Sequence, residues 1–130
     1  MADLFSTFAI SASGMDAQSR RMRHVAENIA NADTPGYRRK TIDFTAQLDR
    51  ARGVTTVATG PVQLDRSELP RIYDPGHALA DADGYYRGST VDTMIEMADA
   101  RQAGRSYEAN LAMFDQARQM SQGLLDLLRR

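Results

Sequence analysis

Apolar side chains recur at helical spacing along the first quarter of the chain. Seven residues separate the successive members of one apolar set: Phe8, Met15, Met22 and Ile29. A second set lies three and four residues away: Ala12, Val25, Ala26 and Ala32. A seven-residue repeat is typical of a helix that packs along a narrow stripe against another helix. The pattern predicts a helix from about Leu4 to Ala32, about 43 Å long at ~1.5 Å per residue.

A matching helix is predicted at the other end of the chain. Thr93-x-x-Glu96 has the form of a capping box, which places the start of this helix near Asp92 or Thr93. An apolar stripe with three-and-four spacing then continues toward Arg130: Ala103, Tyr107, Leu111, Phe114, Ala117, Ser121, Leu124, Leu125 and Leu128. Two such stripes at opposite ends of one chain indicate an antiparallel coiled-coil hairpin.

We expect the two stripes to meet in a helix seam within one subunit. The predicted seam residues come from both helices: Phe8, Met15, Met22, Val25, Ile29, Tyr107, Leu111, Phe114, Leu125 and Leu128. Glycine weakens this hairpin, because Gly14, Gly104 and Gly123 each cost about 1 kcal/mol relative to alanine inside a helix. Since a thin two-helix seam buries little surface, we expect the hairpin either to fray in solution or to be completed by other copies.

The middle of the chain is rich in β-branched and turn residues. Thr41 to Phe44, residues 54–59 and residues 62–65 suit short extended segments. Residues 49–53 read as a polar connection, and residues 69–77 as a further extended piece that ends in a turn. The middle is therefore predicted to be a small β-rich element.

Together these patterns predict a mainly α fold with long terminal helices and a small β-rich insert. Residues 1–36 and 91–130 would form a paired helical domain, and residues 37–90 the insert with its loops. At 130 residues the chain fits one domain, but its helical parts lie at its two ends.

The first predicted helix has a sharp end. Pro35 disfavours helical backbone at Thr34, and Gly36 permits a turn with positive φ. Basic residues lie before and after this turn: Arg20, Arg21, Arg23, Arg38, Arg39 and Lys40. They are either a solvated helix edge or a charged docking face.

Composition excludes several classes of function. The formal net charge is −1, so the chain lacks the basic surface typical of nucleic-acid or anionic-membrane binding. It has no cysteine, which excludes disulfides and thiolate chemistry. No apolar run is long enough to cross a membrane. Asp3 stands where a signal peptide has basic residues, so we expect the N-terminus to be mature helix.

The candidate chemistry is sparse, and no catalytic, cofactor-binding or metal site is predicted. His77 lies near Asp74 and Asp81, but the sequence has no second histidine near it to complete a metal site. Aspartates that cap turns are the simpler interpretation. Glycine-rich phosphate signatures and nucleophile motifs are absent. The sequence therefore predicts that the chain is not an enzyme.

Residues 11–40, SASGMDAQSRRMRHVAENIANADTPGYRRK, resemble the N-terminal signature of flagellar rod, hook and hook-associated axial proteins, in which a helix ends in an ANANTPGY-like sequence. The later segments YDPGHALADADGY, EMA and RSYEAN are similar to proximal rod proteins of the FlgC type. The resemblance gives an assembly role to these residues: Asn28, Asn31, Ala32, Asp33, Thr34, Pro35, Gly36, Tyr37, Asp74, Pro75, Gly76, Tyr107, Glu108 and Asn110.

The resemblance implies a structural protein of the bacterial flagellar basal body. It would be exported by the flagellar type III apparatus without a cleaved signal and would assemble in the periplasmic rod around the export channel. Implied partners are like subunits, rod proteins of the FlgB, FlgF and FlgG types, and the ring-to-rod adaptor FliE. Two alternatives stay open: a rod protein of the FlgB type, which shares the compact DTPGY turn, and a soluble helical-hairpin adaptor or chaperone.

Overall fold

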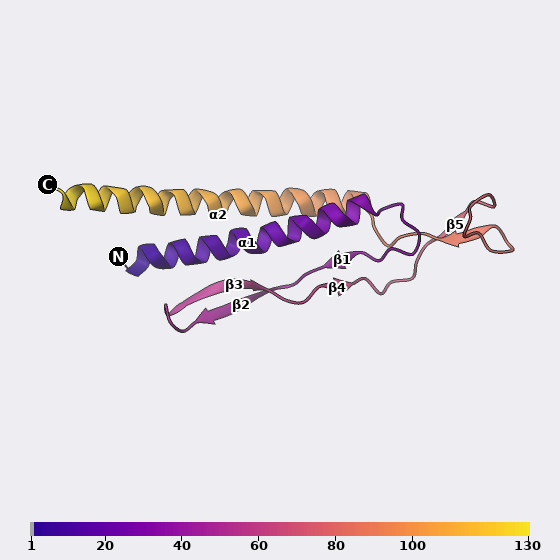
Figure 1. Ribbon diagram of the computed structural model, residues 1–130, viewed down its shortest axis with the longest axis horizontal. Helices are drawn as coiled ribbons and strands as arrows, with labels where there is room; N and C mark the ends of the chain where they lie inside the picture. The colour runs from indigo at the N-terminus through magenta and orange to yellow at the C-terminus, as the bar shows by residue number, and fades with distance from the viewer. Residues whose placement is uncertain (1) are drawn as a thin grey trace.

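Two long antiparallel helices form the body of the molecule (Figure 1). The computed structural model describes residues 2–130. Helix α1 spans Ala2–Ala30 and helix α2 spans Thr93–Leu128. The two run side by side, with the start of α1 and the end of α2 at the same end of the molecule. The two predicted helices are confirmed, with bounds within two residues of those expected from the sequence.

A small insert of antiparallel strands between the helices is also confirmed. In the described part of the chain the strands form three separate pairs: β1 (Lys40–Thr41) with β4 (Gln63–Leu64), β2 (Phe44–Asp49) with β3 (Val54–Thr59), and β5 (Arg71–Tyr73) with β6 (Tyr85–Arg87). The polar residues between β2 and β3 form the turn of a hairpin. The sequence pattern did not predict β6, which is only three residues long.

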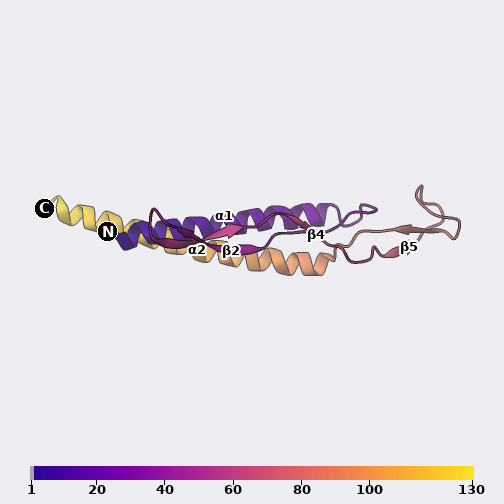
Figure 2. The same cartoon turned by 90° about the horizontal axis from the view of Figure 1, so that it is seen from below.

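The insert lies along α1 and continues beyond the helix pair. The β2–β3 hairpin runs beside α1 on the side away from α2, and the β5–β6 pair lies at the far tip (Figure 1). The Val57 N–H donates to Ser13 Oγ at 3.1 Å, which ties the hairpin to the helix. From below, the molecule is narrow and elongated (Figure 2). Helix α1 is therefore covered on two sides, by α2 and by the hairpin.

Small side chains occupy the buried line between the helices. Ser11, Ala17, Ala103 and Ala117 are at most 3% exposed. On α2 the line repeats every seven residues: Glu96, Ala103, Asn110 and Ala117. A methyl group added at Gly14 of α1 would lie 2.6 Å from the Asn110 Oδ1 atom. The glycine that the sequence marks as a weak point therefore makes room for a side chain of α2.

Larger residues of the predicted seam flank this buried line. The rings of Phe8 and Phe114 meet edge to face, with their centroids 4.9 Å apart. Val25 is buried. Three further seam residues are half-buried: Met15, Met22 and Tyr107.

The structure differs from the predicted seam at four positions, which are exposed: Ile29, Leu111, Leu125 and Leu128. Leu125 and Leu128 lie where α2, with 36 residues, extends beyond α1, with 29. Ile29 and Leu111 are exposed because the buried line between the helices passes through the small and polar residues instead.

The start of α2 also differs from the predicted capping box. Asp92, and not Thr93, is the N-cap residue, and its side chain accepts the Met94 N–H at 3.0 Å. Glu96 is fully buried and contacts other residues instead of turning back to the cap. An aspartate cap satisfies one of the free N–H groups of the first turn, which leaves Glu96 available for a different role.

Candidate assembly site at the end of the first helix

The predicted motif forms a tight turn that leads the chain away from α1. Thr34 Oγ1 donates to Asn31 Oδ1 at 3.1 Å, and Asn31 Nδ2 donates to the Glu27 carbonyl at 2.9 Å. Gly36 has a φ of +76°, a backbone conformation that favours glycine. Its N–H donates to the Gly88 carbonyl at 3.2 Å. The predicted positive φ at Gly36 is confirmed, and the motif residues serve the geometry of the turn.

The segment just before α2 fastens this turn from the other side. Ser89 Oγ donates to the Ala32 carbonyl. The Thr90 N–H donates to the Tyr37 carbonyl at 3.0 Å, and Thr90 Oγ1 accepts the Arg39 N–H at 2.8 Å. The exit of α1 and the entry to α2 are therefore held together by hydrogen bonds.

Asn28 links the last turns of α1 to the chain that follows the motif. Its Oδ1 atom accepts the Tyr37 hydroxyl and the Lys40 N–H, each at 2.9 Å. Its Nδ2 atom donates to the Lys40 carbonyl at 2.9 Å and to Glu96 Oε2 at 3.3 Å. The amide of Asn28 is 1% exposed, and its burial is tolerated because both its donors and its acceptor are bonded.

Glu96 lies fully buried and is neutralised by Arg39. The Nε atom of Arg39 donates to Glu96 Oε1, and its Nη2 atom lies 2.7 Å from Asp99 Oδ2. Arg21 of α1 reaches Asp99 Oδ1 at 3.3 Å. A buried carboxylate is stable only when it is paired and hydrogen-bonded. We call the following side chains the polar cluster: Arg21, Asn28, Tyr37, Arg39, Glu96 and Asp99.

The charges around the polar cluster are fixed at neutral pH. Lys40 Nζ lies 2.6 Å from Glu27 Oε1, and this contact lowers the pKa of Glu27 and raises the pKa of Lys40. Burial raises the pKa of Tyr37, so its hydroxyl stays protonated and donates to Asn28. Burial opposes the charge of Arg39, but the hydrogen bond to Glu96 together with the charges of Glu96, Asp99 and Asp65 outweighs that effect, so the pKa of Arg39 is raised. Each group therefore keeps the protonation state that its bonds require.

Sequence reasoning named Asn28 and Tyr37 but did not assign Arg39 or Glu96 to the same site. The sequence pattern placed Arg39 among the basic residues that follow the turn, and it placed Glu96 in the capping box expected at the start of α2. The missed signal is the seven-residue spacing of Glu96 from Ala103, which places both on one helix face. A glutamate on the buried face of α2 indicates an ion pair only when the residue with the opposite charge is known, and here that residue is Arg39.

At the far tip, aspartates cap the turns as predicted. Asp81 Oδ1 accepts the N–H groups of Tyr85 at 3.0 Å and Asp83 at 2.9 Å, which lowers the pKa of Asp81. Asp74 Oδ1 accepts the Gly76 N–H at 3.2 Å. The interpretation of these carboxylates as turn caps is confirmed.

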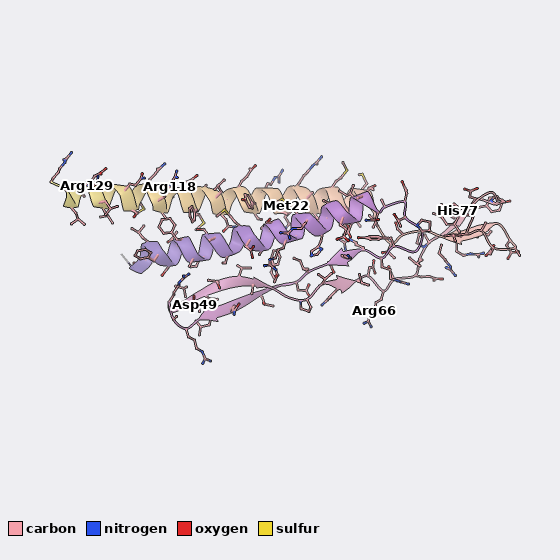
Figure 3. All side chains as sticks on the ribbon, in the orientation of Figure 1. Met22, Asp49, Arg66, His77, Arg118 and Arg129 are labelled. Carbon is pink, nitrogen blue, oxygen red and sulfur yellow. The ribbon has the colours of Figure 1, made fainter. Side chains whose placement is uncertain are left out.

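His77 has a packing role at this tip, far from the helices (Figure 3). Its ring stacks on Tyr86 with centroids 3.9 Å apart, and its Nδ1 atom accepts the Leu79 N–H at 3.1 Å. Within residues 2–130 no three potential metal-binding side chains come together.

The remaining predicted motif residues lie near the surface or between the helices. Three are exposed: Asp33, Pro75 and Glu108. Pro35 is half-buried. Asn110 packs against Gly14 and donates from Nδ2 to the Ser106 carbonyl at 2.8 Å. The helices of the described chain are not apolar enough over a sufficient length to span a membrane.

Known proteins match the chain over nearly its whole length. The flagellar basal-body rod protein FlgC of Agrobacterium fabrum is 43% identical over 136 aligned residues, which cover 99% of this chain and 98% of that protein. The chain belongs to the FlgC family of flagellar basal-body rod proteins. The FlgC proteins of Salmonella typhimurium and Escherichia coli O157:H7 are 36% and 35% identical, and each alignment covers 90% of this chain and 92% of the relative.

Two family descriptions match separate parts of this FlgC-family chain. "Flagella basal body rod protein" matches residues 8–38, which include Asn28 and the turn motif. "Flagellar basal body rod FlgEFG protein C-terminal" matches residues 82–127, which include most of α2. The FlgC relatives favour this type over the FlgB type and over an adaptor. The chain is a structural component of the flagellar basal-body rod, not an enzyme.

Proposed function

We propose that this FlgC-family chain is a subunit of the proximal, periplasmic part of the rod and that its paired helices surround the central export channel and transmit torque. The size of its surface carries this proposal. The accessible surface is 9108 Å², against about 6,800 Å² for a compact monomer of 14.4 kDa. A surface this large relative to mass suits a subunit that buries much of it against neighbours.

The proposed neighbours are like subunits, rod proteins of the FlgB, FlgF and FlgG types, and the adaptor FliE, after delivery by the flagellar type III export apparatus. Exposed apolar side chains support such contacts. Ile95, Met113 and Met120 of α2 are 51%, 49% and 56% exposed. Methionine suits an interface with non-identical partners because its flexible side chain adapts to differently shaped surfaces.

We also propose a division of labour within the subunit. Residues 1–36 and 91–130 would form the axial unit, with coiled-coil packing of α1 against α2, and residues 37–90 would meet adjacent subunits. The seven-residue spacing of the buried line on α2 supports the coiled coil. The polar cluster supports the division, because it ties the start of the insert to both helices.

Complementation of a deletion strain tests the proposed function. The Phe114→Asp variant places a charge where the Phe8 and Phe114 rings meet, so we expect normal synthesis, no completed rod and no swimming. Swimming in soft agar, immunoblots and electron microscopy of isolated basal bodies measure these outcomes. Gln119→Asp is the matched control, since it adds the same charge at an exposed position of α2. Normal swimming of the Phe114→Asp strain would contradict the proposal.

A further inference from the structure

A partly open cavity of about 580 Å³ lies beneath the turn of the β2–β3 hairpin, near the start of α1. Figure 3 shows Asp49 in this turn, at the end of the molecule where α1 begins. Ligand cavities are typically about 300–1,000 Å³ in volume, with a mostly apolar lining and few polar groups. This cavity fits both criteria, since α1 supplies Phe5, Ser6, Phe8, Ala9 and Ala12, α2 supplies Phe114, and the hairpin turn supplies Arg52.

Arg52 gives this cavity a positive edge. Its side chain is 64% exposed, and its Nε atom lies 3.8 Å from Asp49 Oδ2, which is a loose contact. Asp49 Oδ1 accepts the N–H groups of Ala51 and Arg52 at 3.0 and 3.2 Å. Arg50 is exposed in the same turn, so the turn carries two cations and one carboxylate. No acidic residue is among the described residues that line the cavity, and the net charge at its edge is therefore positive.

A second cavity beside the helix pair has the opposite charge at its edge. Its volume is about 270 Å³, and it lies between Leu4 and Thr7 of α1 and Met113 and Met120 of α2. Asp3 is its charged lining residue. Helical side chains three and four positions apart share a face, so the two cavities lie on different faces of α1. We call them the arginine cavity and the aspartate cavity.

We propose that the arginine cavity binds an anionic amphiphile, namely a carboxylate with a medium-length alkyl chain. The chain would cover Phe5, which is 66% exposed, and would remove apolar surface of the cavity from water. The carboxylate would reach Arg52, whose planar guanidinium suits that group. Three elements of one subunit line the cavity, so the site is complete without a neighbour. It goes beyond the proposed rod function, which does not depend on it.

Decanoate and decyltrimethylammonium are suitable probes for the full chain, because their alkyl chains have the same length and their charges are opposite. Isothermal titration calorimetry below the micelle concentration measures both affinities. We expect decanoate to bind about tenfold more tightly, because attraction to Arg52 is replaced by repulsion in the cation. Amide chemical shifts measured by NMR should change most near Ala9 and Arg52 and least near Met120.

Variants separate the role of charge from that of the apolar lining. Arg52→Gln should weaken decanoate binding about fivefold, as expected for the loss of a partly exposed ion pair. Arg50→Gln is the matched control, since it removes the same charge from the same turn at a residue that does not line the cavity. It should change the affinity less than about twofold. Ala9→Leu fills the cavity and should abolish decanoate binding with helix content unchanged.

Several outcomes would overturn this proposal: no binding of decanoate to the wild type, equal affinities for the two probes, or equal effects of Arg52→Gln and Arg50→Gln. Chemical-shift changes confined to the aspartate cavity or to the last turns of α2 would place the ligand elsewhere and would overturn it as well. The Phe114→Asp complementation test involves no added ligand, so the rod function can stand if the arginine cavity binds nothing.

Discussion

At the residue scale, polar side chains with complete hydrogen bonding occupy positions where a two-helix protein usually has leucine. Asn28 and Glu96 are almost fully buried, and each has partners from two or more segments of the chain. Such groups add little net stability compared with apolar packing, but they are costly to bury in any other arrangement. We therefore interpret the polar cluster as the feature that fixes how the insert leaves the helix pair.

Removal of Arg39 should show how much this arrangement depends on charge pairing. Arg39→Met leaves Glu96 buried without its cation, so we expect a loss of about 3–5 kcal/mol in the free energy of unfolding. Adding Glu96→Gln should recover part of that loss, because a neutral amide needs no counter-charge. Urea unfolding followed by circular dichroism measures both effects.

Arg38→Met is the matched control for this experiment. Arg38 donates to the carbonyls of Asp65 and Ser67 at 3.0 and 2.8 Å, so its removal should cost only about 1 kcal/mol. Equal losses for the two arginine variants, or no recovery by Glu96→Gln, would show that charge pairing is not the main role of Arg39.

At the element scale, the helices approach closely because the residues between them are small. Ala17 and Ala103 are buried. Gly14 has no side chain, which leaves room for the side-chain amide of Asn110 beside its Cα. The β2–β3 hairpin covers another side of α1, and a two-stranded hairpin is marginally stable alone. Helix α1 therefore supports both α2 and the hairpin, and a change in the position of α1 would affect both.

A double-mutant cycle between Gly14 and Asn110 tests this close approach. Gly14→Ala gains about 1 kcal/mol of helix propensity but places its methyl group against the Asn110 side chain. We expect that gain to appear fully only in the Asn110→Ala background and to be small or reversed in the wild type. The free energy of unfolding of the four proteins measures the coupling.

Gly104→Ala is the control for the cycle, because a methyl group there meets no atom within 4 Å. It should stabilise the wild type by about 1 kcal/mol. Additivity of Gly14→Ala and Asn110→Ala within about 0.5 kcal/mol would indicate that the two residues do not interact.

At the scale of the whole molecule, the subunit is elongated, and its buried residues form only a thin line between α1 and α2. Several apolar side chains of α2 are more exposed than buried, including Leu127 at 66% and Leu128 at 78%. The interior of one subunit is therefore small relative to its surface. Stability along the chain should be uneven, with the highest protection near the polar cluster.

Amide hydrogen exchange of the purified protein at low concentration should show this gradient. We expect slow exchange in α1 and α2 near Asn28 and Glu96, where the chain is tied from several sides. The last turns of α2 should exchange rapidly, because they extend beyond α1 and have few neighbours. Uniformly strong protection along both helices would contradict this picture and favour a self-contained hairpin.

The two helices, most of the strands and the family could be read from the amino-acid sequence alone. The seven-residue repeat around Met15 and Met22, the stop at Pro35 and Gly36, and the β-branched run at residues 54–59 each depend on neighbours along the chain. Local propensity and periodicity are therefore enough to find them. The same local motif carried the resemblance to axial proteins, and the FlgC relatives bear it out.

Which helix faces and which side chains meet became clear only from the folded chain. Whether Ile29 or Asn28 faces inward depends on the rotation of α1 about its axis, which a repeat of mixed apolar, small and polar residues does not fix. The pairing of Arg39 with Glu96 joins residues 57 positions apart, and nothing local to either residue specifies the other. The free surfaces at the ends of α2 likewise follow from the unequal helix lengths and their alignment, which only the folded chain reveals.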